Sequence, residues 1–166
     1  QRGTPFSARV NMFSSPLGIP CIQPPYGEIA VVDLTSQEII WRRPLGTAAI
    51  SLNGARIGVP LEMGSPYSAG SIVTGSGLIF IGSVMDGYMR AIDLFSGEEL
   101  FADPLHAPSS ATPMSYVSPK TGKQYVLLTV PGEATVSIGA DHSDSGDESD
   151  EVGNGGGYVI AYALPE

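Results

Sequence analysis

The sequence has a single cysteine, few basic residues and no long apolar run. Cys21 is the only cysteine among 166 residues, so no disulfide bond can form within the chain. Lysine and arginine number 8 against 17 acidic residues, a formal net charge of −9. This balance argues against nucleic acid as a partner, because nucleic-acid binders carry a basic face. No apolar stretch approaches the ~18 residues that a membrane-spanning helix needs.

Helical periodicity is also missing, and the start of the sequence has no signal-peptide pattern. No window repeats apolar residues at the i, i+3, i+4, i+7 spacing of an amphipathic helix, whereas 21 glycines and 14 prolines suit many tight turns. We therefore predict an all-β fold. The start at Gln1-Arg2-Gly3 does not resemble a signal peptide, and we expect the chain to be a fragment or processed piece of a longer protein.

The stretch Ser68–Phe101 has the pattern of an antiparallel meander. It contains four short β-rich runs, which are Ser71–Thr74, Leu78–Gly82, Tyr88–Asp93 and Glu98–Phe101. Turn signals that contain glycine separate these runs, as expected for strands joined by hairpins. One four-stranded sheet cannot bury both of its faces alone, so this sheet must stack on others.

A repeat supplies those neighbouring sheets. Gly27–Trp41 aligns with Gly87–Phe101 in a single register, 60 positions apart. The matched pairs include Asp33 with Asp93, Leu34 with Leu94, Glu38 with Glu98 and Trp41 with Phe101. A degenerate third copy, Gly157–Leu164, has Ala163 in place of the aspartate. Repeated meanders indicate a β-propeller, in which we expect the aspartates to accept turn N–H groups and the aromatic residues to fill the gaps between blades.

The predicted organisation is about two to three blades of a partial propeller. Residues 1–60 form a partial blade with long loops, 61–110 a complete blade, and 111–166 the last blade with an acidic insertion at 134–155. We expect Arg42–Tyr67 to be a long connection, because it lacks clean periodicity. Propellers close with 4–8 blades, so the remaining blades of a parent chain are the first expected partner.

Five stretches together resemble the membrane-bound quinoprotein dehydrogenases of glucose, quinate and shikimate, which depend on pyrroloquinoline quinone (PQQ). They are Ser15–Gly27, Asp86–Leu100, Ser109–Tyr116, Gly122–Gly132 and Gly156–Pro165. The resemblance falls at the family's C-terminal end. It implies an eight-bladed periplasmic propeller, anchored to the inner membrane through an N-terminal region, that holds PQQ and a divalent cation, usually calcium.

The resemblance also implies a reaction. A sugar or polyol substrate loses a hydride to PQQ and a proton to an aspartate base, and electrons pass to ubiquinone. The family's base, cation ligands and most cofactor contacts lie upstream of Gln1, so we expect no catalytic or metal residue in this chain and no turnover by the chain alone. The alternative from another class is a non-catalytic propeller scaffold for protein–protein interaction.

Two acidic residues are candidates for the substrate pocket. Asp86 aligns with an aspartate of the family, although an Asp-Gly pair is also a common hairpin turn. Glu133 stands where glucose-oxidising members have a histidine, and its alternative is a solvated loop carboxylate. An acidic residue there would repel a carboxylate such as quinate and could hydrogen-bond a neutral polyol. The replacement of the histidine argues against glucose itself as the substrate.

Four other features are interpreted without a catalytic role. The acidic run from Asp141 resembles a calcium loop but has Val152 where the bidentate glutamate belongs, so we expect a disordered, self-repelling loop. We further predict that the insertion Ala134–Gly155 is an electrostatic lid at the rim of the active site. His106 lacks partners at ligand spacing and is expected to be a loop histidine, and Cys21 is expected to be a small buried apolar residue.

Overall fold

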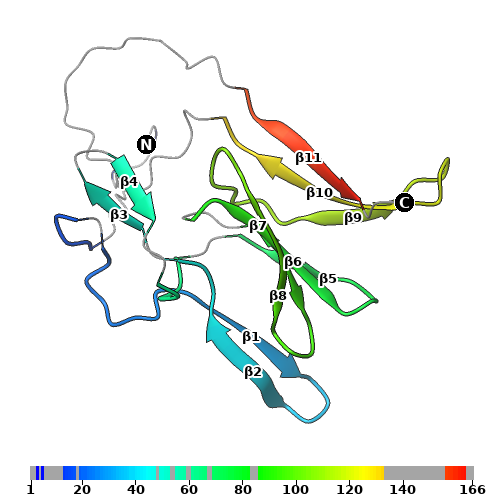
Figure 1. The fold of residues 1–166 in the computed structure, drawn as a ribbon, viewed down its shortest axis with the longest axis horizontal. Helices are drawn as coiled ribbons and strands as arrows, with labels where there is room; N and C mark the ends of the chain where they lie inside the picture. Colours follow the sequence, from blue (N-terminus) through cyan, green and yellow to red (C-terminus); the bar gives the residue numbers. More distant parts are fainter. Residues whose placement is uncertain are drawn as a thin grey trace.

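Over the residues it describes, the computed structural model consists of short β-strands joined by turns and loops (Figure 1). The described residues are 3, 5, 13–17, 19–47, 49–52, 55–58, 61–66, 69–82, 86–132 and 156–163. The strands are β1 (Glu28–Asp33), β2 (Glu38–Pro44), β3 (Ala49–Leu52), β4 (Ala55–Gly58), β5 (Ser71–Val73), β6 (Leu78–Gly82), β7 (Tyr88–Asp93), β8 (Glu99–Pro104), β9 (Met114–Val117), β10 (Gln124–Val130) and β11 (Tyr158–Ala163). Over this part of the chain there is no helix, and hence none that could cross a membrane.

The central sheet is the predicted meander. Its strand order is β5-β6-β7-β8, with every neighbour antiparallel. The last strand runs beyond Phe101 to Pro104. Among the strands whose side chains are described, β6 and β7 are the most buried, because both faces of this sheet are covered by other sheets.

The repeat extends to the hydrogen-bond register. Val31 pairs with Trp41 in the β1–β2 sheet, and Ala91 pairs with Phe101 in the β7–β8 pair, 60 positions later. In both pairs the register shifts directly after this position, so the same β-bulge recurs. The two hairpins are therefore the same structural unit, as the aligned sequences predict.

The third sheet has the order β11-β10-β9. The sequence also predicts a hairpin of Ala111–Val117 with Lys123–Val130 and a final strand at Tyr158–Ala163. Both are confirmed, although β9 begins only at Met114. Figure 1 shows the β1–β2, β5–β8 and β9–β11 sheets stacked in sequence order, which is the arrangement of neighbouring propeller blades. The chain is thus a partial β-propeller, while the predicted divisions near residues 60 and 110 stay predictions.

Two apolar clusters lie between the stacked sheets. The first joins β1–β2 to the central sheet and contains buried Leu45, Ile79, Ile81 and Ile92, with Trp41 packed against it. The second joins the central sheet to the third and contains Met89, Leu105, Ala107, Val126, Leu128 and Val130. Because successive strand residues face opposite sides, Met89 and Ile92 of one strand serve different clusters. The central sheet is held from both faces.

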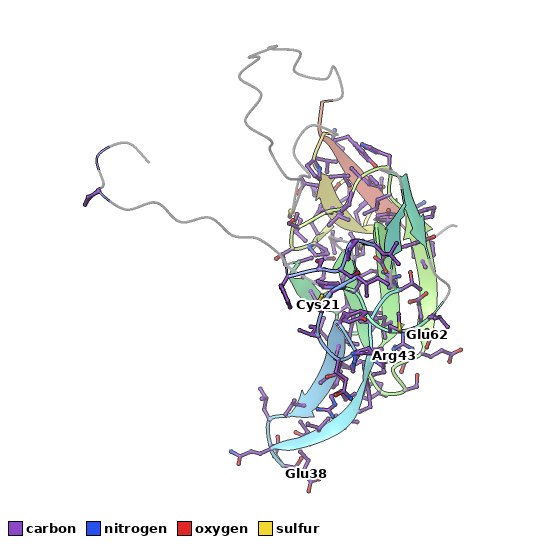
Figure 2. All side chains as sticks on the ribbon, turned by 90° about the vertical axis from the view of Figure 1, so that its left-hand side faces the viewer. Cys21, Glu38, Arg43 and Glu62 are labelled. Carbon is purple, nitrogen blue, oxygen red and sulfur yellow. The ribbon has the colours of Figure 1, made fainter. Side chains whose placement is uncertain are left out.

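Two expectations are wrong. Arg42–Tyr67 is not only a connection, because β3 and β4 pair within it as a hairpin. The sequence between them is Asn53-Gly54, a turn pair that is the strongest short hairpin signal, and apolar residues alternate with polar ones on either side of it. Cys21 is exposed rather than buried, since the proline-rich segment around it lies at the surface, outside both apolar clusters (Figure 2).

The turn of the β1–β2 hairpin contains a strained residue. Gln37 has φ 61, a left-handed conformation, while its repeat partner Gly97 has φ 73. Both residues donate a backbone N–H to the carbonyl of the repeat aspartate, Asp33 or Asp93. Left-handed backbone costs a non-glycine residue about 1 kcal/mol, whereas glycine adopts it freely.

Gln37→Gly is therefore expected to raise the free energy of unfolding, by about 0.5 kcal/mol after the greater chain entropy of glycine is deducted. Urea denaturation measures the change. Gln124→Gly, at a strand position, is the control and should destabilise the protein. A loss of stability in both variants would contradict the strain argument.

Candidate functional site

Four connections meet at one end of the stacked sheets, which we call the loop end. It comprises Leu45–Thr47 after β2, Asp86–Gly87 before β7, Leu105–Ser109 after β8, and Pro131–Gly132 after β10. Leu45 N–H donates to Gly27 O at 3.1 Å, and Leu105 N–H donates to Gly87 O at 2.7 Å, again 60 positions apart. The opposite end holds the repeat turns; Figure 2 shows Glu38 at that tip and Arg43 farther into the body.

Asp86 lies at the loop end, in the connection between β6 and β7. Its carboxylate accepts two bonds from the Arg90 guanidinium, at 3.1 Å (Nη1–Oδ1) and 2.6 Å (Nη2–Oδ2). It also accepts the backbone N–H of Thr47 at 3.3 Å. The Asp86 side chain is only 2% exposed and that of Arg90 5%. Gly87 has φ 73, but Asp86 lacks the positive φ of a two-residue Asp-Gly hairpin turn, and the connection from β6 to β7 is longer than such a turn.

The ion pair continues into a network of alternating charge. Arg90 Nε donates to Glu99 Oε2 at 2.9 Å, and Glu99 lies 3.9 Å from Arg43 on β2. The Arg90 guanidinium also lies 5.1 Å from the centre of the Tyr88 ring. Sequence reasoning missed this network, because neither the β-bulge that sets Glu99 near Arg90 nor the stacking that brings in Arg43 is visible in residue spacing.

Glu133, the second candidate, lies outside the described residues. Contacts between the connection after β8 and the start of β11 link β10, the strand that leads to Glu133, to the region around Asp86. His106 follows Leu105 and stacks on the Tyr158 ring with centroids 4.1 Å apart, and Tyr158 pairs with Val130. The structure therefore brings the end of β10 and the Asp86 connection to the same end of adjacent sheets. The calcium-like run from Asp141 and the insertion Ala134–Gly155 also lie outside the described residues.

The repeat aspartates are structural, as predicted. Asp33 Oδ1 accepts the N–H of Thr35 at 2.8 Å, and Asp93 Oδ1 accepts those of Phe95 and Ser96 at 2.9 and 2.7 Å. These backbone bonds favour the ionised form and lower the pKa of both carboxyl groups below the ordinary 3.8.

A pH dependence of stability follows. Since both pKa values are depressed in the folded state, the stabilisation is complete above the unfolded-state pKa and is lost as the pH falls through the folded-state pKa, below about pH 5. We expect the double variant Asp33→Asn, Asp93→Asn to lose less stability than the wild type between pH 6 and pH 3. Urea midpoints at both pH values test this, and an unchanged pH dependence would count against it.

Trp41 packs between neighbouring sheets, as expected, whereas Phe101 is 45% exposed and only touches the next sheet. Trp41 Nε1 donates to Leu94 O at 2.8 Å across to the central sheet. Phe101 meets Tyr162 of β11 edge to face, with centroids 5.9 Å apart. Burial and the bond that the Tyr162 hydroxyl donates to Asp103 at 2.8 Å raise the pKa of that tyrosine.

The side chains at the loop end do not have the donor set of a divalent-cation site. Within the described ranges, no group of three or more His, Cys, Asp or Glu residues could hold a metal ion. The carboxylates of Asp86 and Glu99 are instead bound to Arg90. A guanidinium in that place supplies the positive charge that a cation would otherwise bring to these carboxylates.

Comparison with known proteins shows the family. Residues 1–126 match the β-propeller domain of the PQQ-dependent glucose/ethanol/alcohol dehydrogenases. Quinate/shikimate dehydrogenase (quinone) of Acinetobacter baylyi is 38% identical over 98% of this chain and 18% of its own length. Quinoprotein glucose dehydrogenase of Escherichia coli is 36% identical over 100% of this chain and 19% of its own length. The large subunit of glycerol dehydrogenase of Gluconobacter thailandicus is 41% identical over 78% of this chain and 18% of its own length.

The chain therefore belongs to the PQQ-dependent dehydrogenase family, an oxidoreductase family, in its β-propeller domain. The resemblance inferred from the five sequence stretches is confirmed. The chain spans about a fifth of the length of these relatives, at 18% and 19%.

Proposed function

We propose that this chain is the C-terminal part of a PQQ-dependent dehydrogenase that oxidises sugars, polyols or related alcohols of the glucose, quinate and shikimate class. The parent is periplasmic, anchored to the inner membrane by an N-terminal region, and passes electrons to ubiquinone. The observation that carries the proposal is identity of 38% to a quinate/shikimate dehydrogenase along 98% of the chain. Relatives that act on glucose and glycerol support the wider substrate class.

In this proposal the chain supplies residues that line the substrate pocket, while the redox chemistry belongs to the cofactor. PQQ with a divalent cation, calcium in our proposal, would supply the hydride-accepting chemistry in the parent enzyme. The catalytic base and the cation ligands belong to the blades outside this chain. Asp86 and Glu133 form part of the substrate pocket, and the stacked sheets fix the strands that lead to them.

Glu133 would set the charge preference of that pocket. A carboxylate repels the carboxylate of quinate and accepts hydrogen bonds from the hydroxyl groups of a neutral substrate. We therefore propose a neutral polyol or sugar as the preferred substrate. Glu133→Gln is expected to raise kcat/KM for quinate relative to glycerol, because it removes the repulsion and keeps a hydrogen-bonding group.

The decisive experiment is reconstitution of the full-length protein with PQQ and calcium. Dye reduction and ubiquinone reduction are measured with glucose, glycerol, quinate and shikimate, with PQQ omitted as the control. We expect PQQ-dependent turnover of at least one neutral polyol or sugar. Absence of PQQ-dependent turnover with every substrate would overturn the proposal and favour the non-catalytic scaffold.

The isolated chain provides a separate prediction. It should neither reduce dye nor bind PQQ tightly, because a cofactor site needs convergent groups from several elements and most of the proposed ones lie in other blades. Quenching of Trp41 fluorescence measures PQQ binding, and circular dichroism checks that the β-structure is retained. A dissociation constant at or below about 1 μM would contradict the proposal that this part alone lacks the site.

A further inference from the structure

The ion pair of Asp86 and Arg90 has a geometry that fixes a carboxylate. Two parallel N–H···O bonds of 3.1 and 2.6 Å join the guanidinium to both carboxylate oxygens. This arrangement sets the plane of the carboxylate as well as its position, which a single point charge cannot do. Both side chains are almost fully buried, at 2% and 5% exposure, so water does not compete for these bonds.

Arg90 is itself held from other sides. Glu99 on β8 accepts from Nε at 2.9 Å, leaving Nη1 and Nη2 directed at Asp86. Tyr88 lies 5.1 Å from the guanidinium carbon. Arg43, on β2 of the neighbouring sheet, lies 3.9 Å from Glu99 and extends the network between sheets. The guanidinium therefore has a fixed orientation set by strands, not by a loop.

Asp86 transmits that orientation to the loop end. Its Oδ2 accepts the N–H of Thr47 at 3.3 Å, just after β2 of the neighbouring sheet. The next residue, Gly87, accepts the N–H of Leu105 at 2.7 Å. The carboxylate thus sits where connections from two sheets meet, and displacing it would displace both.

We propose that Arg90 is a positioning residue, which acts on the substrate pocket through the carboxylate of Asp86. The inference rests on the proposed function, because it takes Asp86 as part of the pocket for a neutral polyol or sugar. Arg90 does not touch the substrate. It holds Asp86, and the connections bound to Asp86, in the arrangement that the substrate hydroxyl groups require.

The test uses the full-length holoenzyme and four variants, Asp86→Asn, Arg90→Lys, their combination, and Arg42→Lys. Lysine keeps the charge of Arg90 but cannot make two parallel bonds, so the fold should survive while the carboxylate is released. We expect Arg90→Lys to lower kcat/KM about 10-fold and Asp86→Asn about 100-fold, which is the range that small misplacements of a site produce. Arg42, which pairs with Glu28 at 3.6 Å on the exposed surface, is the matched control and should leave kcat/KM unchanged.

The double variant decides how Arg90 acts. If Arg90 works only through Asp86, adding Arg90→Lys to Asp86→Asn should change kcat, KM and the PQQ dissociation constant less than about twofold, because coupled residues are non-additive. Two results would overturn the positioning role while the pocket role of Asp86 stands. One is that the losses of kcat/KM from the two single substitutions multiply in the double variant. The other is that the Arg90→Lys enzyme has the kcat/KM of the wild type. An Asp86→Asn enzyme with unchanged kcat/KM and PQQ affinity would instead remove the pocket role, and the positioning role with it.

Discussion

Trp41→Ala is expected to lower the free energy of unfolding by about 3 kcal/mol, the largest single loss among the side chains that join the β1–β2 sheet to the central sheet. The indole packs against the cluster of Leu45, Ile79, Ile81 and Ile92. Its Nε1 donates to Leu94 O at 2.8 Å, so truncation also leaves that carbonyl without its donor. Urea denaturation followed by circular dichroism measures the effect, since Trp41 is the only tryptophan.

The repeat supplies the control. Phe101 occupies the equivalent register position but is 45% exposed and meets mainly the Tyr162 ring. Phe101→Ala should therefore cost only about 1 kcal/mol, the scale of an exposed aromatic pair. Trp41→Phe should cost about 1 kcal/mol as well, through the lost hydrogen bond. Equal losses for Trp41→Ala and Phe101→Ala would show that the indole does not join the sheets as described.

The repeat is also where the sequence predicted most of the structure. The strands of the central sheet, the hairpin at Gly27–Trp41 and the roles of Asp33 and Asp93 all follow from local turn chemistry and from one register held over fifteen residues. Such features depend on neighbours in the chain, so they can be recognised without knowledge of the packing. Asn53-Gly54 and the alternating apolar residues Ile50, Leu52, Ala55 and Ile57 signal the hairpin β3–β4. Its strands are only four residues long and lie within a proline-marked stretch that has no longer periodicity, so the prediction missed them.

The candidate site could be predicted only in part. The sequence identified Asp86, but it could not place the carboxylate against Arg90, because that contact depends on how the connection folds back onto β7. The links to Glu99 and Arg43 require a β-bulge and the stacking of two sheets. Contacts between residues far apart in the chain produce no periodic sequence pattern, so the charge network could be recognised only in the structure.

Gly64→Ala is expected to be the most disruptive glycine substitution at the junction of the β1–β2 sheet with the segment 61–66. A Cβ at Gly64 would lie 2.1 Å from the carbonyl oxygen of Gly27 and 2.7 Å from its nitrogen. Both atoms are backbone, so no side chain can move aside. Gly64 N–H donates to Gly46 O at 3.1 Å, and Tyr26 N–H donates to Met63 O at 2.7 Å, which hold the two backbones together.

Gly64 also has φ +73, so steric contact and backbone conformation oppose alanine together. The conformational part costs about 1 kcal/mol and the forced shift of backbone about 2 kcal/mol more. Gly122→Ala separates the conformational cost from the steric cost. Gly122 has φ +69 but no atom within 4 Å of the place that an alanine methyl group would take. We expect a loss of about 3 kcal/mol for Gly64→Ala against about 1 kcal/mol for Gly122→Ala in urea denaturation. If the two losses are equal, the close approach of Gly27 to Gly64 does not constrain the fold, and the junction beneath Gly46 and Thr47 is looser than the structure indicates.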